Sequence, residues 1–156
     1  MSGACDVSVV VPVYGNAETV GPLQARLRAV LDRAALAHET VFVDDASPDG
    51  SLAALRALAE RDPAVRVLAL PRNRGQHRAV LAGLRLARGR HVAIMDADLQ
   101  DPPEALPALL ARARDGYDAV FAGRRGHYES RGRLLTSRVF KWLLHAATGL
   151  PADAGM

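Results

Sequence analysis

Two aspartates stand two residues apart in Asp96-Ala97-Asp98, after a run of apolar residues that predicts a buried strand. In an extended chain, residues i and i+2 point to the same side, so both carboxylates can face one point in space. Two such carboxylates repel each other and lose solvation unless a cation lies between them. Mg²⁺ and Mn²⁺ prefer oxygen ligands and bridge to substrate phosphates. We therefore predict a divalent-cation site for a nucleotide diphosphate, with Asp96, Asp98 and Gln100 as ligands.

Asp98 and Asp101 have a second interpretation, as caps of the following helix. Asp101 precedes Pro102-Pro103, and an acid before a proline at the first helical position is typical of a helix start. Capping is the favoured role for Asp101, whereas Asp96 still lies in the predicted strand. A lone Asp-x-Asp is a weak indicator, and it gains weight from the polar residues elsewhere in the chain.

Each of five apolar runs is followed by polar or charged residues. These tails are 12–18, 44–47, 71–77, 96–101 and 123–125. In open α/β sheets, ligands bind beyond the carboxyl ends of the strands, so five loops are predicted to converge on one site. An acid at Asp44 or Asp45 can accept hydrogen bonds from a base or ribose, and a turn or cap role for Asp45 with Ser47 is the equal alternative.

The elements that must position these loops alternate along the chain. Strands are predicted at 7–13, 40–44, 65–70, 91–96 and 118–122, where apolar residues run nearly without interruption. Helices are predicted at 20–34, after an N-cap at Ser47, at 79–88 and after Asp101. This order predicts one α/β domain over residues 1–156, with a mostly parallel sheet and helices on both faces.

Composition and the lack of certain motifs argue against several classes of protein. The formal charge of +3 is too small to indicate nucleic-acid binding. Cys5 is the single cysteine, which favours a reducing compartment. No signal-peptide pattern and no apolar run of about 20 residues is present. There is no P-loop, no Gly-x-Gly-x-x-Gly after the first strand and no serine elbow, so NTPase, dinucleotide and acyl-transfer chemistry are not indicated.

The motifs together resemble the family-2 glycosyltransferases of GT-A fold, which is Rossmann-like. The matching segments are Val-Val-Val-Pro-Val-Tyr, Val-Asp-Asp-Ala-Ser, Asn-Arg-Gly-Gln, Asp-Ala-Asp-Leu-Gln-Asp-Pro-Pro-Glu and Gly-Arg-Arg. They occur in the right order from Val7 to the end of the chain. The fourth segment is specific to the transferases that load a sugar onto dolichyl or polyprenyl phosphate. The resemblance implies an inverting transfer from a nucleotide-diphosphate sugar, UDP- or GDP-linked, to a polyprenyl phosphate, with a divalent cation.

The resemblance also implies residue roles. Asp96 contacts the ribose or the metal, Asp98 and Gln100 hold the metal, and Arg124 binds the donor diphosphate and stabilises the charge that grows on it. The remaining residues expected around the nucleotide-sugar are Pro12, Tyr14, Glu18, Asp44, Asp45, Gln76 and Arg125. The subgroup usually has Tyr-Asn-Glu where this chain has Tyr14-Gly15-Asn16, which leaves the choice between uracil and guanine open.

The segment 131–148 predicts an amphipathic helix, with leucines and Trp142 against a basic side. Basic flanks and a tryptophan are typical of a helix in a membrane interface, and an ordinary core helix is the alternative. An enzyme with this segment and a lipid acceptor is expected in the cytoplasm, bound peripherally at the cytoplasmic face of the membrane. Oligomeric state is not indicated.

Asp153 lies where the look-alike enzymes carry an acid before a strand that returns to the active site. It is expected to act in catalysis by orienting the acceptor, by taking its last proton, or by holding a donor-binding arginine. The pattern stops at Met156, so we expect a truncated or partial chain that binds the donor without appreciable transfer. The alternative function is a non-catalytic nucleotide-sugar-binding module.

Overall fold

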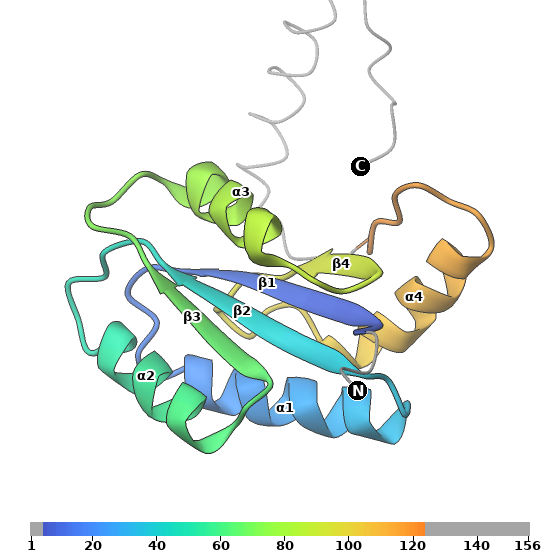
Figure 1. Ribbon diagram of the computed structural model, residues 1–156, viewed down its shortest axis with the longest axis horizontal. Helices are drawn as coiled ribbons and strands as arrows, with labels where there is room; N and C mark the ends of the chain where they lie inside the picture. Colours follow the sequence, from blue (N-terminus) through green and yellow to red (C-terminus); the bar gives the residue numbers. More distant parts are fainter. Residues whose placement is uncertain (1–4, 124–156) are drawn as a thin grey trace, which may run out of the picture. The chain divides into compact units, whose positions relative to one another are not determined.

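The computed structural model describes residues 5–123, in which strands and helices alternate (Figure 1). The described residues up to Asp118 form one compact unit. Of the second unit, which starts at Ala119, only residues 119–123 are described, and they are irregular. The elements are β1 (Val7–Val13), α1 (Val20–Arg33), β2 (His38–Asp44), α2 (Ser51–Arg61), β3 (Val65–Ala69), α3 (Gln76–Leu86), β4 (His91–Ile94), the 3₁₀ helix η1 (Pro103–Ala105) and α4 (Leu106–Arg114). Every helix among residues 5–123 is too short or too polar to traverse a lipid bilayer.

The strands within the described residues form a parallel sheet in the order β3-β2-β1-β4. Val7 pairs with His38 on one side and with His91 on the other, and Thr40 pairs with Val65. The order changes direction between β1 and β4, because the chain first builds outward through β2 and β3 and then returns to the other side of β1. Such a switch point is where ligands bind in open α/β sheets.

The two faces of the sheet bury separate cores. Figure 1 shows α1 and α2 on one side of the strands and α3 on the other. Odd-numbered residues of β1, with Phe42, pack against α1, α2 and α4, and the large residues buried there include Leu23, Leu27, Leu31 and Leu55. Val10, Val41 and Val43 pack on the other face against Ala79 of α3. All residues of β1 are buried, as the uninterrupted β-branched run predicts.

Two glycines allow backbones to approach closely. A Cβ at Gly83 would collide with Cγ1 of Val10 and lie 3.0 Å from Cγ2 of Val43. A Cβ at Gly89 would collide with the backbone of Val7 and Ser8. Glycine therefore lets α3 and the turn after it lie directly on the sheet.

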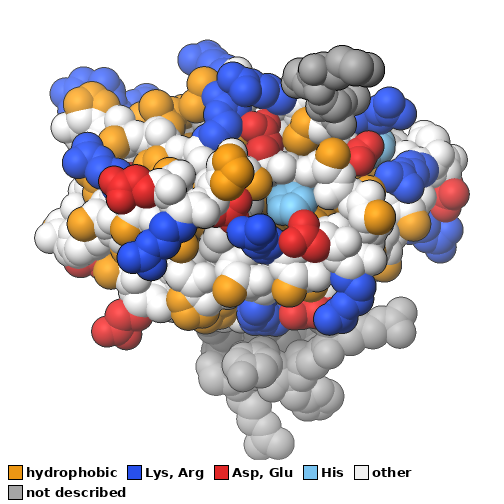
Figure 2. Space-filling view, turned by 60° about the horizontal axis from the view of Figure 1, so that its bottom comes forward, with side chains coloured by type: hydrophobic (Ala, Val, Ile, Leu, Met, Phe, Trp, Pro, Cys, Tyr) orange, Lys and Arg blue, Asp and Glu red, His pale blue; other side chains and the backbone are white. Residues whose placement is uncertain are grey.

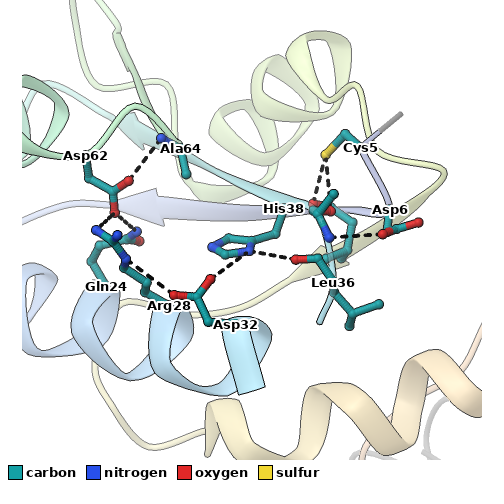
Figure 3. A network of polar contacts seen from close by, with 11 residues as sticks. Cys5, Asp6, Gln24, Arg28, Asp32, Leu36, His38, Asp62 and Ala64 are labelled. Carbon is teal, nitrogen blue, oxygen red and sulfur yellow. Dashed lines mark hydrogen bonds and ion pairs between the residues drawn. The ribbon is translucent and has the colours of Figure 1, made fainter. Parts of the chain in front are cut away.

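Polar groups tie the amino ends of the strands together, away from the strand ends that carry the predicted site. In Figure 3, Gln24 donates a 3.0 Å hydrogen bond to Asp62, and Arg28 joins Asp62 to Asp32. Nδ1 of His38 lies 3.0 Å from the carbonyl oxygen of Leu36. This network links α1 to the end of α2 and to the start of β2.

Glu39 is the centre of a second, more buried group at this edge. Its carboxylate accepts hydrogen bonds from Ser8 Oγ at 2.7 Å, from the Arg66 guanidinium at 3.0 Å and from the Arg88 amide at 2.7 Å. Burial raises the pKa of Glu39, but these hydrogen bonds and the charge of Arg66 outweigh the effect of burial, so its pKa lies below the usual 4.5.

Acidic and basic side chains are interspersed over the face of the molecule shown in Figure 2.

Several local predictions were wrong. Residues 118–122 form no strand in the described part of the chain, and Phe121 is 87% exposed. A short apolar run cannot by itself supply a pairing partner. The second helix begins at Ser51 with Gly50 as its N-cap, because the side chains before it hold a neighbouring loop. The N-cap of η1 is Pro102 rather than Asp101.

Candidate functional site

A cavity of about 360 Å³ opens at the carboxyl ends of the strands, at the switch point between β1 and β4. Its volume falls in the range of small-ligand sites. The lining residues come from the loops after four strands and from α3, and they are Pro12, Tyr14, Asn16, Asp45, Asn73, Gly75, Gln76, Ala79, Asp96, Ala97 and Asp98. Four of the five loops predicted to converge therefore meet here; Arg124 and Arg125, in the fifth, lie outside the described residues.

The loop between β1 and α1, which carries Tyr14 and Asn16 into the cavity, is held by the loop between β2 and α2. Three consecutive amides of the first loop donate to side chains of the second loop and of the first residue of α2: Gly15 to Ser47 Oγ at 3.2 Å, Ala17 to Asp49 Oδ2 at 3.2 Å and Asn16 to Ser51 Oγ at 2.9 Å. Asp49 also accepts bonds from the hydroxyl and amide of Ser51, and the hydroxyl hydrogen bond is the main cause that lowers its pKa. The wall of the cavity is thereby kept in one conformation.

Asp45 holds the opposite wall. Its two carboxylate oxygens accept hydrogen bonds from the amides of Arg74 and Gly75, each at 2.7 Å. Asp45 is 3% exposed, and Gly75 takes a φ of +84°, which favours glycine. Asp45 therefore sets the conformation of the loop between β3 and α3. It accepts no hydrogen bond from Ser47, whose amide donates to Asp44 instead, so the turn role with Ser47 that was the alternative for Asp45 is not what the described residues show.

The Asp96-Ala97-Asp98 segment is a turn rather than the end of a strand. β4 ends at Ile94, and Leu99 has a φ of +63°, which is uncommon for a branched residue. Oδ1 of Asp96 accepts a 2.7 Å hydrogen bond from the Gln76 side chain, and Oδ1 of Asp98 accepts a 3.0 Å bond from the Gln100 amide. Backbone strain of this kind is common where a site must be held in a fixed shape. The prediction that Asp96 lies in the strand was wrong, yet both carboxylates line the cavity.

The donor set around the cavity suits Mg²⁺ or Mn²⁺. Asp96 and Asp98 supply hard carboxylate oxygens, and Oδ2 of Asp98 accepts no hydrogen bond from the described residues. No cluster of three histidine, cysteine, aspartate or glutamate side chains exists in this part of the chain. A cation here would take two protein carboxylates and complete its shell with water and phosphate oxygens, as Mg²⁺ usually does. The residues present therefore fit a metal that arrives with a diphosphate.

Six of the residues predicted to bind the donor or metal line the cavity: Pro12, Tyr14, Asp45, Gln76, Asp96 and Asp98. Glu18 and the Gln100 side chain are exposed and do not line it. Asp44 is buried, is not among the lining residues and accepts a 3.4 Å hydrogen bond from the Ser47 amide. The roles of these three residues stay predictions. Arg125 and the expected catalytic residues Arg124 and Asp153 lie outside the described residues, as does the segment 131–148.

Five further residues line the cavity that were not named as donor or metal ligands: Asn16, Asn73, Gly75, Ala79 and Ala97. All but Ala79 lie in loops that the sequence predicted to converge on the site. Asn73 and Gly75 stand in the Asn-Arg-Gly-Gln segment, where an asparagine two residues before a glycine signals a turn. Asn73 Oδ1 indeed accepts a 3.1 Å bond from the Gly75 amide. Small residues such as Ala79 and Ala97 give no local signal, because they matter only for the space that they leave.

The parallel α/β sheet, with carboxylates and polar loops around a cavity at its switch point, has the architecture of a GT-A-like domain. Residues 8–149 match the family model described as glycosyl transferase family 2. The chain therefore belongs to glycosyl transferase family 2.

Similar curated proteins share one name. The chain is 43% identical over 145 residues to the undecaprenyl-phosphate 4-deoxy-4-formamido-L-arabinose transferase of Pseudomonas paraeruginosa, covering 92% of this chain and 43% of that protein. It is 40% identical over 146 residues to the protein of that name from Aeromonas hydrophila, covering 92% and 44%. The chain thus spans less than half the length of these relatives.

Similar solved structures have the same fold. The mannosyltransferase PcManGT of Pyrobaculum calidifontis, in complex with GDP-Man and Mn²⁺, superposes with a TM-score of 0.58 at 26% identity, covering 99% of this chain and 50% of that one. Staphylococcus aureus TarS residues 1–349, in complex with UDP, superposes with a TM-score of 0.57 at 20% identity, covering 80% and 40%. The second likeness concerns the fold alone.

Proposed function

We propose that this chain forms the donor-binding part of a glycosyltransferase that moves a sugar from a nucleotide diphosphate to a polyprenyl phosphate, with inversion at the sugar. The observation that carries the proposal is the cavity in which Asp45, Asp96 and Asp98 meet at the switch point of the sheet. Family membership and the name shared by the relatives support it. Their name points to undecaprenyl phosphate as acceptor and to 4-deoxy-4-formamido-L-arabinose as the sugar.

The donor is proposed to lie across the cavity. Tyr14 is 54% exposed on the wall formed by the loop after β1, so its ring is available to contact a base or ribose. Asp96 and Asp98 lie at the other side of the switch point, where the diphosphate with its cation is expected. When bound, a divalent cation supplies positive charge that stabilises the leaving diphosphate. Arg124 is proposed to add a bidentate contact to the same oxygens.

The reaction exchanges one bond for another at the anomeric carbon. The bond between that carbon and the diphosphate oxygen breaks, and an acceptor phosphate oxygen forms the new bond from the opposite side. The acceptor phosphate is already ionised near neutral pH, so a strong general base is not required. Asp153 is proposed to orient the acceptor or one of the donor-binding arginines. An acceptor of this kind resides in a bilayer. The enzyme is therefore proposed to bind peripherally to a membrane, at its cytoplasmic face, with the segment 131–148 as a proposed contact.

A binding screen followed by a transfer assay tests the proposal. Calorimetry with UDP, GDP and their sugars, each with Mn²⁺, is expected to find one nucleotide that binds clearly better than the other. Transfer is then measured with undecaprenyl phosphate and the full-length protein. Failure of every nucleotide diphosphate to bind would contradict the proposal. Binding without transfer by the full-length protein would instead indicate a non-catalytic nucleotide-sugar-binding module.

A further inference from the structure

One long stretch of the chain has basic residues and no acids. Residues 63–95, which include β3, α3 and β4, contain seven arginines and two histidines but no aspartate or glutamate. The whole chain has 20 basic and 17 acidic residues, so its small net charge hides this separation. All the elements of the stretch belong to the same compact unit.

Within this stretch, α3 presents basic and apolar side chains on its outward side. Ala79 and Gly83 face the sheet. With about 100° of rotation per residue, Arg78, Leu81 and Arg85 fall within an arc of about 60° on the opposite side of the helix. All three are exposed, Leu81 by 56%, and neither arginine has an ion pair with a described residue.

β4 adds apolar side chains on the same side of the sheet. Val92 and Ile94 pair in register with Ser8 and Val10, and Val10 packs against α3. Cross-strand partners share a face, so Val92 and Ile94 lie on the α3 side of the sheet. They are 42% and 56% exposed, because α3 packs over β1 and β2 rather than over β4. We call Arg78, Leu81, Arg85, Val92 and Ile94 the α3 surface.

We propose that the α3 surface binds the anionic headgroups of a phospholipid bilayer. Arginines that lack acidic partners are attracted to the negative surface potential, and the apolar side chains between them can enter the interface. Charge complementarity therefore selects an anionic membrane as the occupant of this surface.

The placement also suits the proposed function, on which the inference rests in part. Gln76, at the first position of α3, lines the cavity, and Arg85 lies about 14 Å further along the helix axis at 1.5 Å per residue. A bilayer in contact with the α3 surface would bring the cavity close to lipid-borne phosphates. The α3 surface shares no residue with the segment 131–148, which is unchanged in all three variants of the test.

Vesicle co-sedimentation of the full chain tests the α3 surface. The probe is vesicles of phosphatidylglycerol and phosphatidylcholine in equal parts, with pure phosphatidylcholine for comparison. The double variant Arg78→Gln, Arg85→Gln should reduce the partition coefficient about 25-fold on the mixed vesicles at low salt, about five-fold for each arginine. Leu81→Ser should lower binding by a smaller factor and leave its salt dependence unchanged, because it removes no charge.

The matched control removes the same charge from the other side of the sheet. Arg56 and Arg61 are exposed on α2 and have no ion pair with a described residue, so Arg56→Gln, Arg61→Gln should change binding less than two-fold or so. Equal losses in both pairs, or no loss in the α3 pair, would overturn the proposal, since net charge or another segment would then explain the binding. If inorganic phosphate displaces the protein from the vesicles, and the protein shows no preference for vesicles over free phosphate, the surface binds a free anion instead. That result would also overturn the proposal.

The membrane inference and the proposed function are tested by different measurements. Calorimetry with UDP and GDP in solution reports on the cavity alone and should give the same affinity for wild type and for the α3 pair. If wild type binds nucleotide but the α3 pair keeps full vesicle binding, the membrane inference alone is wrong.

Discussion

The side-chain amide of Gln76 donates a 2.7 Å hydrogen bond to Oδ1 of Asp96, across 20 residues of sequence. Gln76 opens α3 and Asp96 follows β4, so the bond joins two walls of the cavity. The bond fixes one oxygen of the Asp96 carboxylate at the cavity wall.

Replacing Gln76 by alanine should weaken binding of a nucleotide diphosphate about five-fold, because the Asp96 carboxylate loses an exposed hydrogen bond of about 1 kcal/mol that holds it in place. Calorimetry with the preferred nucleotide measures the change. His77→Ala is the control: His77 is exposed in the same helical turn but does not line the cavity, and it should leave affinity unchanged. Equal effects of the two substitutions would show that the helix start, rather than the bond to Asp96, matters.

Asp98→Ala should remove the dependence of nucleotide-diphosphate binding on a divalent ion. The two carboxylates of the cavity are the expected protein ligands, and loss of one leaves too few hard oxygens to hold the cation. Titrations with Mn²⁺ and with a chelator should differ for wild type and coincide, at low affinity, for the variant. Wild-type affinity that is insensitive to the chelator would contradict the metal assignment.

Asp45→Ala should destabilise the protein by about 2–4 kcal/mol, because the amides of Arg74 and Gly75 both lose their charged hydrogen-bond acceptor. Urea unfolding measures the free energy. The loop between β3 and α3 should also exchange its Arg74 and Gly75 amide protons faster than wild type. Unchanged exchange of these two amides would rule out a positioning role for Asp45.

Gly83→Ala should destabilise by about 1–3 kcal/mol, because its methyl group would overlap Val10 and force α3 away from the sheet. Gly21→Ala is the matched control in α1, where a Cβ meets nothing within 4 Å. That change should be neutral or stabilise by up to about 1 kcal/mol, from helix propensity. Thermal or urea unfolding of both variants separates packing from propensity, and similar losses in both would disprove the close approach of α3.

Glu39 should make the stability of the protein depend on acid pH. Its folded pKa lies below the usual 4.5, so the carboxylate contributes stability above that value and loses it as the pH falls through the lower, folded pKa. The free energy of unfolding of wild type should therefore decline as the pH drops below about 5. Glu39→Gln should be less stable at pH 7 and should decline less steeply. Parallel curves for the two proteins would exclude Glu39 as the source.

Much of the fold was predictable because its signals are local. The β-branched run 7–13 coincides with β1, and four apolar runs became the four parallel strands of the described sheet. The α/β class and the GT-A resemblance are confirmed by the family match and by the solved neighbours. The polar residues at the strand ends are also recognisable from the adjacent sequence, which is why six of the predicted residues line the cavity.

The tertiary structure decided the contacts between residues that are far apart in the sequence. Asp45 holds Arg74 and Gly75 from 29 and 30 residues away, Gln76 reaches Asp96, and Ser47 serves a distant loop instead of capping a helix. The absence of a strand at 118–122 within the described residues has the same origin. A buried strand, or an acid at the end of one, can be recognised from adjacent residues in the sequence. The donor that bonds to such an acid cannot, because it is whichever group the packed sheet brings within 3 Å or so.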